Sequence, residues 1–485
     1  MKPVREILYK VNINKVIGDT STLIKKIVFD SRKVKSKDLY VAINGVKVDG
    51  HNYIDSAIKK GAICIVCESI PNKTQDGVLY VEVESSRSAL GIISSNYFSV
   101  PSSKLKLIGI TGTNGKTTIA TLLYNLYKNS GLSTGLISTV VNYINEKEIE
   151  SSQTTPDSLT INNLLNEMVD EGVKYCFMEV SSHGIEQKRI SGLEFAGGIF
   201  SNLTHDHLDY HTSFEQYRDV KKDFFDSLST NAFCLINKDD KNGMYMTQNT
   251  SSKVFTYGLK TYADYKTKIL ESSLEGMLLK INENEFWTNL SGKFNAYNIL
   301  AVFSTASILG MPYNETLKII SMLKSIKGRF EYLKLNDITA IIDYAHTPDA
   351  LKNIINSIND IKKNKESLIT IIGCGGDRDK SKRALMGDIA SSLSSKVIFT
   401  SDNPRNESPE SIIKDMISGV KPVNSVKTIS ISNRKEAIKT ACQLAQSNDI
   451  ILIAGKGHET YQEINDKKYL FDDYKVVKEC LTKMN

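Results

Sequence analysis

The chain has 485 residues, of which 41% are hydrophobic and 24% are charged, with a formal net charge of +6. Such values are ordinary for a globular protein, and the length corresponds to about three domains. The apolar runs are too short to span a bilayer, and the first residues lack the apolar segment of a secretory signal. We therefore expect a cytoplasmic protein without membrane insertion. No basic run is interleaved with aromatic residues, so no nucleic-acid partner is expected.

Alternating apolar segments and helical patterns predict an α/β protein with parallel sheets covered by helices. We expect three domains: a small α/β domain over 1–103, a central mononucleotide-binding domain over 104–328 and a Rossmann-like domain over 329–485. The proline-containing segment 101–104 is the expected first linker. The predicted strands are 39–42, 62–67 and 78–83 in the first domain, 107–110 and 175–179 in the second, and 338–342, 368–372, 397–400 and 450–454 in the third.

The seven cysteines are scattered and indicate no disulfide framework. Cys64 and Cys67 form a C-x-x-C pair, but they lie in a predicted strand, where residues three apart face opposite sides. Structural cysteines are therefore favoured over a redox or zinc pair.

A glycine-rich turn follows the apolar segment 107–110 and precedes a helical pattern that starts near residue 119. Gly112 and Gly115 allow a tight backbone whose N–H groups face one point, and Lys116 adds a positive charge. The turn therefore predicts a cradle for nucleotide phosphates, although Ile110 stands where the general pattern has glycine. The alternative is a turn that binds nothing. The predicted ATP-binding residues are Gly112, Thr113, Asn114, Gly115, Lys116, Thr117 and Thr118.

Two further segments indicate magnesium ligands near this turn. Thr117 offers a hydroxyl, and Glu179 ends a predicted strand, where ligands gather in parallel sheets. The segment 201–211 holds three of the seven histidines, but without the cysteines or spacing of a zinc site. We favour His207 as a ligand of a second magnesium ion, with the other two histidines structural. A surface glutamate is the alternative for Glu179.

Lys221 lies on an apolar helical stripe, four residues after Tyr217 and three before Phe224. Such a lysine either snorkels to water or takes part in chemistry, since burial makes an amine nucleophilic. Asn295 and Asn298 open a later helix, where their amides suit an adenine or ribose, although asparagine at that place often caps the helix.

Three predicted strands of the third domain end in polar loops that should converge over one crevice. The loops carry arginines, which suit carboxylates, and acids, which suit an ammonium group, so a zwitterionic ligand is predicted. The alternative is a surface of mutually satisfied charges. The loop residues are Arg378, Asp402, Asn403, Arg405 and Glu459, and Asp343 in a separate loop is expected to reach the nucleotide.

These motifs, in this order, make the chain similar to the Mur ligase family over essentially its whole length. The resemblance rests on the segments 30–32, 38–42, 112–118, 154–156, 179–184, 206–211, 343–348, 377–383, 402–405 and 455–459. It implies an ATP- and Mg²⁺-dependent ligase that extends a peptide through an acyl phosphate. Because reactants from three domains must meet, we expect the third domain to close over the nucleotide, and we expect a monomer.

The resemblance also implies roles for further residues. Lys221 matches a family lysine that carries a carbamate formed with CO₂ and binds magnesium, and Arg329 joins the nucleotide site. Ser31 and the segment 46–48 would contact the UDP end of the substrate, although Val46 departs from relatives that have a polar residue there. The muramoyl dipeptide would be held by Gln153, Thr154, Thr155, Ser181, Gln187 and Arg189, and the incoming amino acid by Arg378, Asp402, Asn403, Pro404, Arg405, Gly455 and Glu459.

The implied substrates are UDP-N-acetylmuramoyl-L-alanyl-D-glutamate and meso-2,6-diaminopimelate. The segment 402–405 resembles that of diaminopimelate-adding members, and Arg405 could pair with the second carboxylate that lysine lacks. Ser381 replaces a glycine of many relatives without affecting this assignment. A lysine-adding Mur ligase or a folylpolyglutamate-synthase-like ligase is the alternative enzyme. A protein that hydrolyses ATP only to change shape is the alternative of another class.

Overall fold

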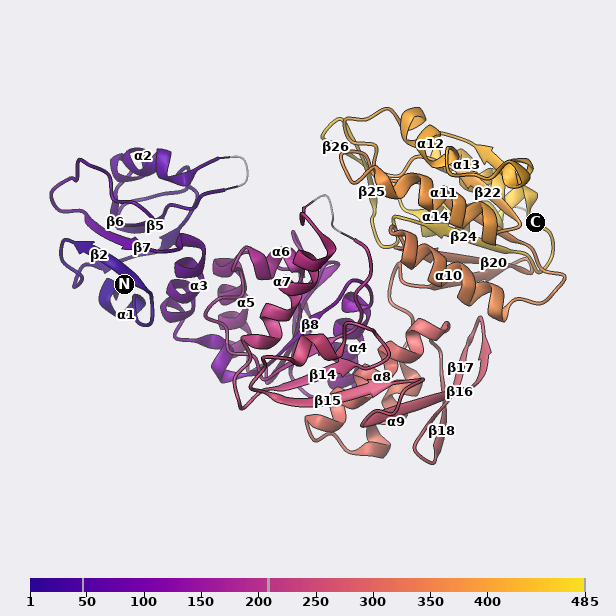
Figure 1. Cartoon of the computed structure of the whole chain (residues 1–485), viewed down its shortest axis with the longest axis horizontal. Helices are drawn as coiled ribbons and strands as arrows, with labels where there is room; N and C mark the ends of the chain where they lie inside the picture. Colours follow the sequence, from indigo (N-terminus) through magenta and orange to yellow (C-terminus); the bar gives the residue numbers. More distant parts are fainter. Residues whose placement is uncertain (46–47, 207–209, 484–485) are drawn as a thin grey trace.

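The computed structural model describes residues 1–45, 48–206 and 210–483. Val46 and His207, both named above, lie outside the described residues. Figure 1 shows three bodies in chain order: an indigo N-terminal body, a purple to salmon central body and an orange to yellow C-terminal body. Each body is built around its own sheet, which confirms the α/β class. Among the described residues, no helix combines the length and the apolar character needed to cross a membrane.

The N-terminal sheet has the strand order β2-β7-β6-β5-β4. Its edge strand β2 runs antiparallel to β7, and the other pairs are parallel. Cys64 and Cys67 on β6 are both buried and belong to apolar cores on opposite faces of the sheet, as the strand pattern predicts. The elements are β1 (Lys2–Pro3), α1 (Val4–Ile7), β2 (Ile13–Ile17), β3 (Leu23–Ile24), β4 (Ile27–Val28), β5 (Asp38–Val41), η1 (Gly50–Tyr53), α2 (Ile54–Lys59), β6 (Ala62–Cys67), β7 (Leu79–Val83), α3 (Ser86–Tyr97) and η2 (Pro101–Lys104).

The central sheet has 11 strands in the order β11-β10-β9-β12-β8-β13-β14-β15-β16-β17-β18. Its middle is parallel, but a hairpin at one edge and a meander at the other are antiparallel, which the expectation of parallel sheets missed. The strands are β8 (Lys106–Thr111), β9 (Thr134–Ile137), β10 (Val141–Ile144), β11 (Lys147–Glu150), β12 (Tyr175–Glu179), β13 (Gly197–Phe200), β14 (Phe233–Asn237), β15 (Lys253–Gly258), β16 (Tyr265–Ser273), β17 (Gly276–Ile281) and β18 (Asn284–Thr288).

Helices cover both faces of the central sheet. Successive side chains of β8 alternate between the faces, so that Leu107 joins the core under α5 and α7, and Ile108 joins the core under α4 and α8. The central helices are α4 (Lys116–Asn129), α5 (Ser158–Asp170), α6 (Ser182–Glu186), α7 (Phe214–Asp226), η3 (Met244–Thr247), α8 (Lys293–Ile308) and α9 (Tyr313–Met322).

The C-terminal sheet has the order β19-β20-β24-β21-β22-β23, with β19 antiparallel and the other pairs parallel. Both faces carry apolar cores. The strands are β19 (Glu331–Leu335), β20 (Ile338–Asp343), β21 (Leu368–Ile372), β22 (Lys396–Phe399), β23 (Thr428–Ser430), β24 (Ile450–Ala454), and the hairpin β25 (Tyr461–Ile464) and β26 (Lys467–Leu470). The helices are α10 (Pro348–Ile361), α11 (Ser381–Leu393), α12 (Pro409–Ile417), η4 (Pro422–Lys427), α13 (Arg434–Leu444) and α14 (Asp473–Thr482).

Candidate active site

The glycine-rich turn joins β8 to α4, and α4 begins at Lys116, three residues earlier than the sequence pattern indicates. Gly112 has φ +146° and Gly115 has φ +89°, both in the region that favours glycine. A Cβ on Gly112 would overlap Ser201 Oγ, and one on Gly115 would lie 2.7 Å from Asn298 Oδ1. The turn is therefore a tight backbone loop at a helix N-terminus, which is a geometry that binds phosphate.

Lys116 folds back over this loop, where its Nζ donates to the carbonyls of Gly112 at 2.9 Å and Thr113 at 2.8 Å. Desolvation lowers the pKa of Lys116, and the negative charge of Glu179 opposes that shift. The ammonium is thus held at the mouth of the loop by weak neutral acceptors, which a phosphate oxygen could replace.

Thr117 and Glu179 meet beside the loop and fit a magnesium ion. Thr117 Oγ1 donates to Glu179 Oε2 at 3.0 Å, while Glu179 Oε1 accepts from the Thr139 N–H at 2.7 Å. Glu179 is fully buried, and a hydroxyl with a carboxylate is a donor set suited to magnesium. Arg329 Nη2 donates to Thr117 Oγ1 at 3.3 Å. Among the described residues no group of three acids, histidines or cysteines has a metal-binding arrangement, and the predicted ligand His207 lies outside them.

Lys221 on α7 is buried and points inward, so it does not snorkel. Its Nζ donates to the Gly112 carbonyl at 3.0 Å and lies 4.8 Å from the centroid of the Tyr217 ring. Burial, followed by the repulsion of Lys116, lowers the pKa of Lys221 well below its ordinary value. The Lys221 amine therefore lies against the glycine-rich turn.

Six residues predicted to hold the dipeptide form a connected network next to Glu179. Thr155 Oγ1 donates to the Glu179 carbonyl at 2.8 Å and accepts from the Ser181 N–H at 3.0 Å. Arg189 Nη1 donates to the Thr155 carbonyl at 2.6 Å. The network continues through Arg189 to Gln153 and Gln187, and through Thr139 to Thr154. Ser31 lies apart in the N-terminal body, where its carbonyl accepts from Lys60 Nζ at 3.0 Å.

The residues predicted to bind the nucleoside of ATP lie in two places: Asn295 and Asn298 beside the glycine-rich turn, and Asp343 in a separate segment. Asn298 lies against Gly115, and its Nδ2 donates to Asn295 Oδ1 at 3.0 Å, so both amides lie beside the loop. Asp343 instead accepts from the N–H groups of Phe330 and Ala345, both at 2.7 Å. Burial raises the pKa of Asp343, and Arg329 opposes the shift. Asp343 thus orders the segment that links the central and C-terminal bodies.

In the C-terminal body, Arg378 and Arg405 both lie close to Gly375. A Cβ there would be 3.1 Å from Arg405 Nη1 and 3.6 Å from Arg378 Cγ. Arg405 has φ +50°, and its Nε donates to Glu463 Oε2 at 2.9 Å while Nη1 donates to the Gly376 carbonyl at 2.7 Å. Among the described residues, Nη2 has no hydrogen-bond partner. That nitrogen is therefore available for a hydrogen bond to a ligand.

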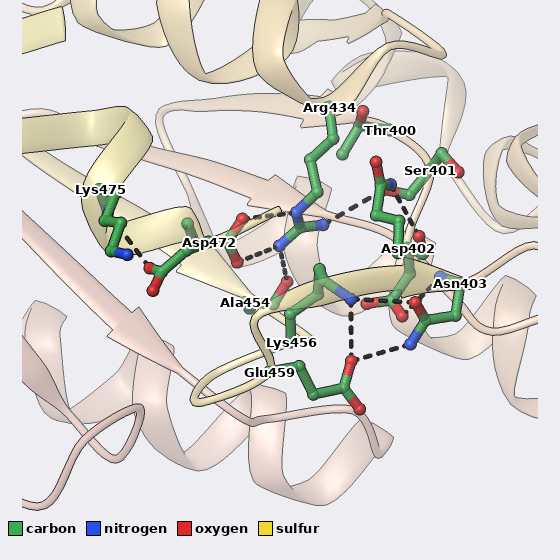
Figure 2. A network of polar contacts seen from close by, with 12 residues as sticks. Thr400, Ser401, Asp402, Asn403, Arg434, Ala454, Lys456, Glu459, Asp472 and Lys475 are labelled. Carbon is green, nitrogen blue, oxygen red and sulfur yellow. Dashed lines mark hydrogen bonds and ion pairs between the residues drawn. The ribbon is translucent and has the colours of Figure 1, made fainter. Parts of the chain in front are cut away.

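The other residues predicted for the amino acid lie in the neighbouring loops. Gly455 has φ +111°, and a Cβ there would lie 2.5 Å from Asp402 Oδ2. Asn403 Nδ2 donates to Glu459 Oε2 at 2.8 Å (Figure 2). The Pro404 carbonyl lies against Gly376, where a Cβ would overlap it. All seven residues predicted for the amino acid therefore belong to one set of neighbouring loops.

Sequence reasoning missed Lys456 and Glu463, which hold this pocket together. Lys456 Nζ donates to Asn403 Oδ1 at 3.0 Å and to Glu459 Oε2 at 2.8 Å (Figure 2). The Glu463 N–H donates to Asn403 Oδ1 at 2.9 Å. The position of Lys456 between two glycines, directly after a buried strand, was the available signal.

A buried ion pair, Arg434–Asp473, connects the strand ends that carry these loops. Arg434 on α13 donates to Asp473 through Nε and Nη2, both at 2.8 Å, and neither side chain is exposed. Its Nη2 also donates to the Ala454 carbonyl at 3.0 Å, and Nη1 to the Ser401 carbonyl at 3.4 Å (Figure 2). The pair therefore joins the ends of β22 and β24, from which the pocket loops emerge.

Comparison with known proteins gives concordant matches. Family models match residues 23–98 (Mur ligase family, catalytic domain), 110–306 (Mur ligase middle domain) and 328–457 (Mur ligase, glutamate ligase domain). UDP-N-acetylmuramoyl-L-alanyl-D-glutamate–2,6-diaminopimelate ligase of Phocaeicola vulgatus is 52% identical over 475 residues, covering 98% of both chains. The enzyme of that name from Bacteroides fragilis is 52% identical over 479 residues, covering 99% of both chains.

Solved structures agree with these matches. A structure of a UDP-N-acetylmuramoyl-L-alanyl-D-glutamate–2,6-diaminopimelate ligase superposes with a TM-score of 0.70 at 30% identity, covering 100% of this chain and 99% of the other. A Mycobacterium tuberculosis folylpolyglutamate synthase complexed with ADP shares the fold at 16% identity and a TM-score of 0.62, covering 76% of this chain and 91% of that one. The chain belongs to the Mur ligase family.

Proposed function

We propose that the protein is an ATP-dependent ligase of peptidoglycan synthesis that joins meso-2,6-diaminopimelate to UDP-N-acetylmuramoyl-L-alanyl-D-glutamate. The observation that carries the proposal is that one set of neighbouring loops holds the arginines Arg378 and Arg405 and the acids Asp402 and Glu459. It occurs in a chain that shares 52% of its residues, over 98% of its length, with a relative of that name. The enzyme is proposed to act as a monomer in the cytoplasm, which light scattering and cell fractionation would test.

The nucleotide is proposed to bind at the loop that joins β8 to α4. The loop N–H groups and the α4 N-terminus would receive the phosphates, with Lys116 turning from its loop carbonyls to a phosphate oxygen. Thr117 and Glu179 would hold Mg²⁺, which supplies positive charge to the phosphate oxygens when bound. Asn295 and Asn298 are proposed to bind the nucleoside of ATP. Arg329 is proposed to join the nucleotide site, since it donates to Thr117 Oγ1.

We propose in addition that Lys221 is carbamylated: its neutral amine adds to CO₂, an N–C bond forms and one proton is released. Support comes from its burial and from the position of its Nζ, 3.0 Å from the Gly112 carbonyl. A carbamate would replace this amine next to Lys116 by an anion suited to magnesium. Mass spectrometry of the intact protein at neutral pH with ¹³CO₂ would detect it, and an unlabelled Lys221 would contradict it.

The proposed reaction has two steps. An oxygen of the D-glutamyl carboxylate attacks the γ-phosphorus of ATP, ADP leaves and an acyl phosphate forms. The amine of the amino acid then attacks the acyl carbon, phosphate leaves with that oxygen and a proton is released, which leaves the amide. Lys116 would stabilise the charge that spreads over the phosphate oxygens in the first step. The network around Thr155 and Arg189 would orient the carboxylate.

The choice of amino acid follows from the charges of the C-terminal pocket. Glu459 and Asp402 suit an ammonium group, and Arg378 and Arg405 suit carboxylates. Diaminopimelate has a second carboxylate that lysine lacks, so lysine would leave one arginine without an acceptor. This distinction favours diaminopimelate over lysine.

The test is incubation with ATP, the UDP-muramoyl dipeptide and each candidate amino acid, followed by product mass. We expect a product with diaminopimelate and little or none with lysine, glutamate or a folate substrate. A lysine or folylpolyglutamate product would replace the proposal by one of the alternatives. Phosphate release that needs neither the UDP substrate nor an amino acid would instead indicate a nucleotide-driven switch.

A further inference from the structure

Lys456 is a fully buried lysine beside the proposed amino-acid pocket. It follows β24 in a sharp backbone bend, since Gly455 has φ +111° and Gly457 has φ +53°. The bend directs the side chain inward, where its Nζ lies 5.6 Å from the centroid of the Tyr461 ring. A buried ammonium group is costly unless it is paired and hydrogen-bonded, so its partners indicate why it is there.

Both side-chain partners of Lys456 are proposed ligands of the amino acid. Its Nζ lies 3.0 Å from Asn403 Oδ1 and 2.8 Å from Glu459 Oε2 (Figure 2). Both polar atoms of the Asn403 amide have hydrogen-bond partners in the protein. Oδ1 also accepts from the Glu463 N–H, and Nδ2 donates to Glu459 Oε2. Asn403 is therefore largely a bridge between Lys456 and Glu459.

This arrangement distinguishes the two oxygens of Glu459. Oε2 accepts from both Lys456 and Asn403, whereas Oε1 has no hydrogen-bond partner among the described residues. The Glu459 side chain is 16% exposed, so it is not closed off from solvent. Lys456 and Asn403 thus anchor one oxygen and leave the other for a donor from outside the protein.

We infer that Lys456 is a positioning residue: by holding Glu459 Oε2 and Asn403, it directs Glu459 Oε1 to the ammonium group of the incoming amino acid. The inference rests on the proposed function, because it assumes that the pocket around Glu459 receives an amino acid. Lys456 itself touches no substrate. Its contribution is to the binding of the third substrate and to the orientation of that amine.

The pair Arg434–Asp473 shows what a purely structural buried pair looks like in the same body. Arg434 bonds Asp473 and backbone carbonyls, and it contacts no proposed ligand residue through a side-chain hydrogen bond. A structural pair affects folding stability and the affinity for all substrates alike. Lys456 is expected to differ, because both of its side-chain partners face the amino acid.

The first measurement is steady-state kinetics of Lys456→Met, which keeps the length of the side chain and removes its donors. Loss of a charge-assisted hydrogen bond is worth about 10- to 100-fold, so we expect KM for diaminopimelate to rise by about that factor. KM for ATP and for the UDP substrate should change less than about threefold. Lys467→Met is the matched control, since Lys467 is exposed on β26 of the adjoining hairpin. Its three KM values should equal those of the wild type.

A double-mutant cycle with Glu459→Gln then tests whether Lys456 acts through Glu459. If it does, Lys456→Met should add less than about threefold in the Glu459→Gln background. Equal increases in all three KM values, or multiplying effects in the double variant, would overturn the inference. If Lys456→Met does not fold, Lys456→Gln, which keeps a donor for one partner, takes its place with an expected rise of about tenfold.

The proposed function is judged separately by the amino acid that the wild type couples. If that amino acid is not diaminopimelate, the proposed function fails. The double-mutant cycle is then run with the amino acid that the enzyme does use. A selective rise in its KM would still support the role of Lys456, and an unchanged KM would remove it.

Discussion

The proposed phosphate loop and the proposed amino-acid pocket are built in different ways. The loop is one continuous segment, and its shape depends on the backbone of Gly112 and Gly115, where a Cβ would meet neighbouring atoms. The pocket is assembled from loops after β21, β22 and β24 and from the hairpin β25–β26, and side-chain bonds hold it together. The first site should therefore be sensitive to added atoms, and the second to lost charges and donors.

The largest expected effect is that of Gly112→Ala. The new Cβ would overlap Ser201 Oγ, and the residue has φ +146°, so the loop has to change shape and ATP binding should be lost together with activity. Titration calorimetry with an ATP analogue would measure this.

Gly131→Ala is the matched control, because Gly131 also has positive φ, +80°, but no atom lies within 4 Å of the position that a Cβ would take there. It should cost only about 1 kcal/mol of stability and leave ATP binding intact. Equal ATP affinity in Gly112→Ala would contradict the view that the loop backbone forms the site.

Lys221→Ala comes next, with an expected loss of about 10³-fold in kcat. The reason is the removal of a buried amine next to Gly112 and Lys116, where the proposed carbamate would lie. Short carboxylic acids such as acetate should restore part of the activity.

The neighbouring Lys222 provides the control, since it forms an ion pair with Asp226 at 2.5 Å on the same helix. Lys222→Ala should affect stability more than turnover, and acetate should not change its rate. Full activity of Lys221→Ala would exclude a role for the amine.

Arg405→Ala should lower kcat/KM for diaminopimelate by about 10²-fold and have a much smaller effect on any lysine activity. The guanidinium group is held by Glu463 and the Gly376 carbonyl, so little ordering would be needed for it to bind the proposed carboxylate. Competition between labelled diaminopimelate and lysine would measure the ratio. Equal losses for both amino acids would show that Arg405 does not read the second carboxylate.

The smallest effect is expected for Glu407→Gln. Glu407 pairs with Arg383 and is not among the residues proposed to bind the amino acid, so the substitution should lower stability rather than substrate binding. Hydrogen bonds from buried Arg383 lower the pKa of Glu407 from 4.5 to about 2. Because this folded-state pKa lies below that of the unfolded chain, the stabilisation is present above pH 4.5 and is lost as pH falls towards 2. The variant should lose about 2 kcal/mol of unfolding free energy at pH 7.

The pH dependence of Glu407→Gln separates this pair from general destabilisation. Urea unfolding at several pH values should show a difference from the wild type that shrinks from about pH 5 towards about pH 2. A difference that is independent of pH would contradict the assigned role of the Glu407 charge.

The fold and the tight glycine-rich turn could be predicted because their signals are local. Buried strands such as 450–454 and 368–372 are continuous apolar runs, and the loop 112–118 carries its glycines and lysine in one segment. The antiparallel edges of the central sheet could not be predicted in this way. Their strands, such as Lys147–Glu150, are short, polar and exposed, so that pairing with a neighbour rather than burial determines them.

For the proposed amino-acid site, the sequence analysis named the arginines and acids but not the residues that hold their loops together. The glycines on both sides of Lys456 and the buried strand before it signal a bend, but they do not name its partners, and Glu463 lies in a half-exposed hairpin without any such signal. Asn403 was expected to bind a ligand directly, and its amide is mostly engaged by Lys456, Glu463 and Glu459. Contacts between loops distant in sequence depend on the tertiary fold, which residue patterns do not specify.

The central claim is that a carboxylate phosphorylated at the phosphate loop is captured by an amine held in the C-terminal body. Its most direct test is a turnover with the UDP substrate labelled with ¹⁸O in both oxygens of the D-glutamyl carboxylate. One ¹⁸O should appear in each phosphate released, and the other should remain in the amide. Phosphate without ¹⁸O, released while the amide still forms, would contradict the account.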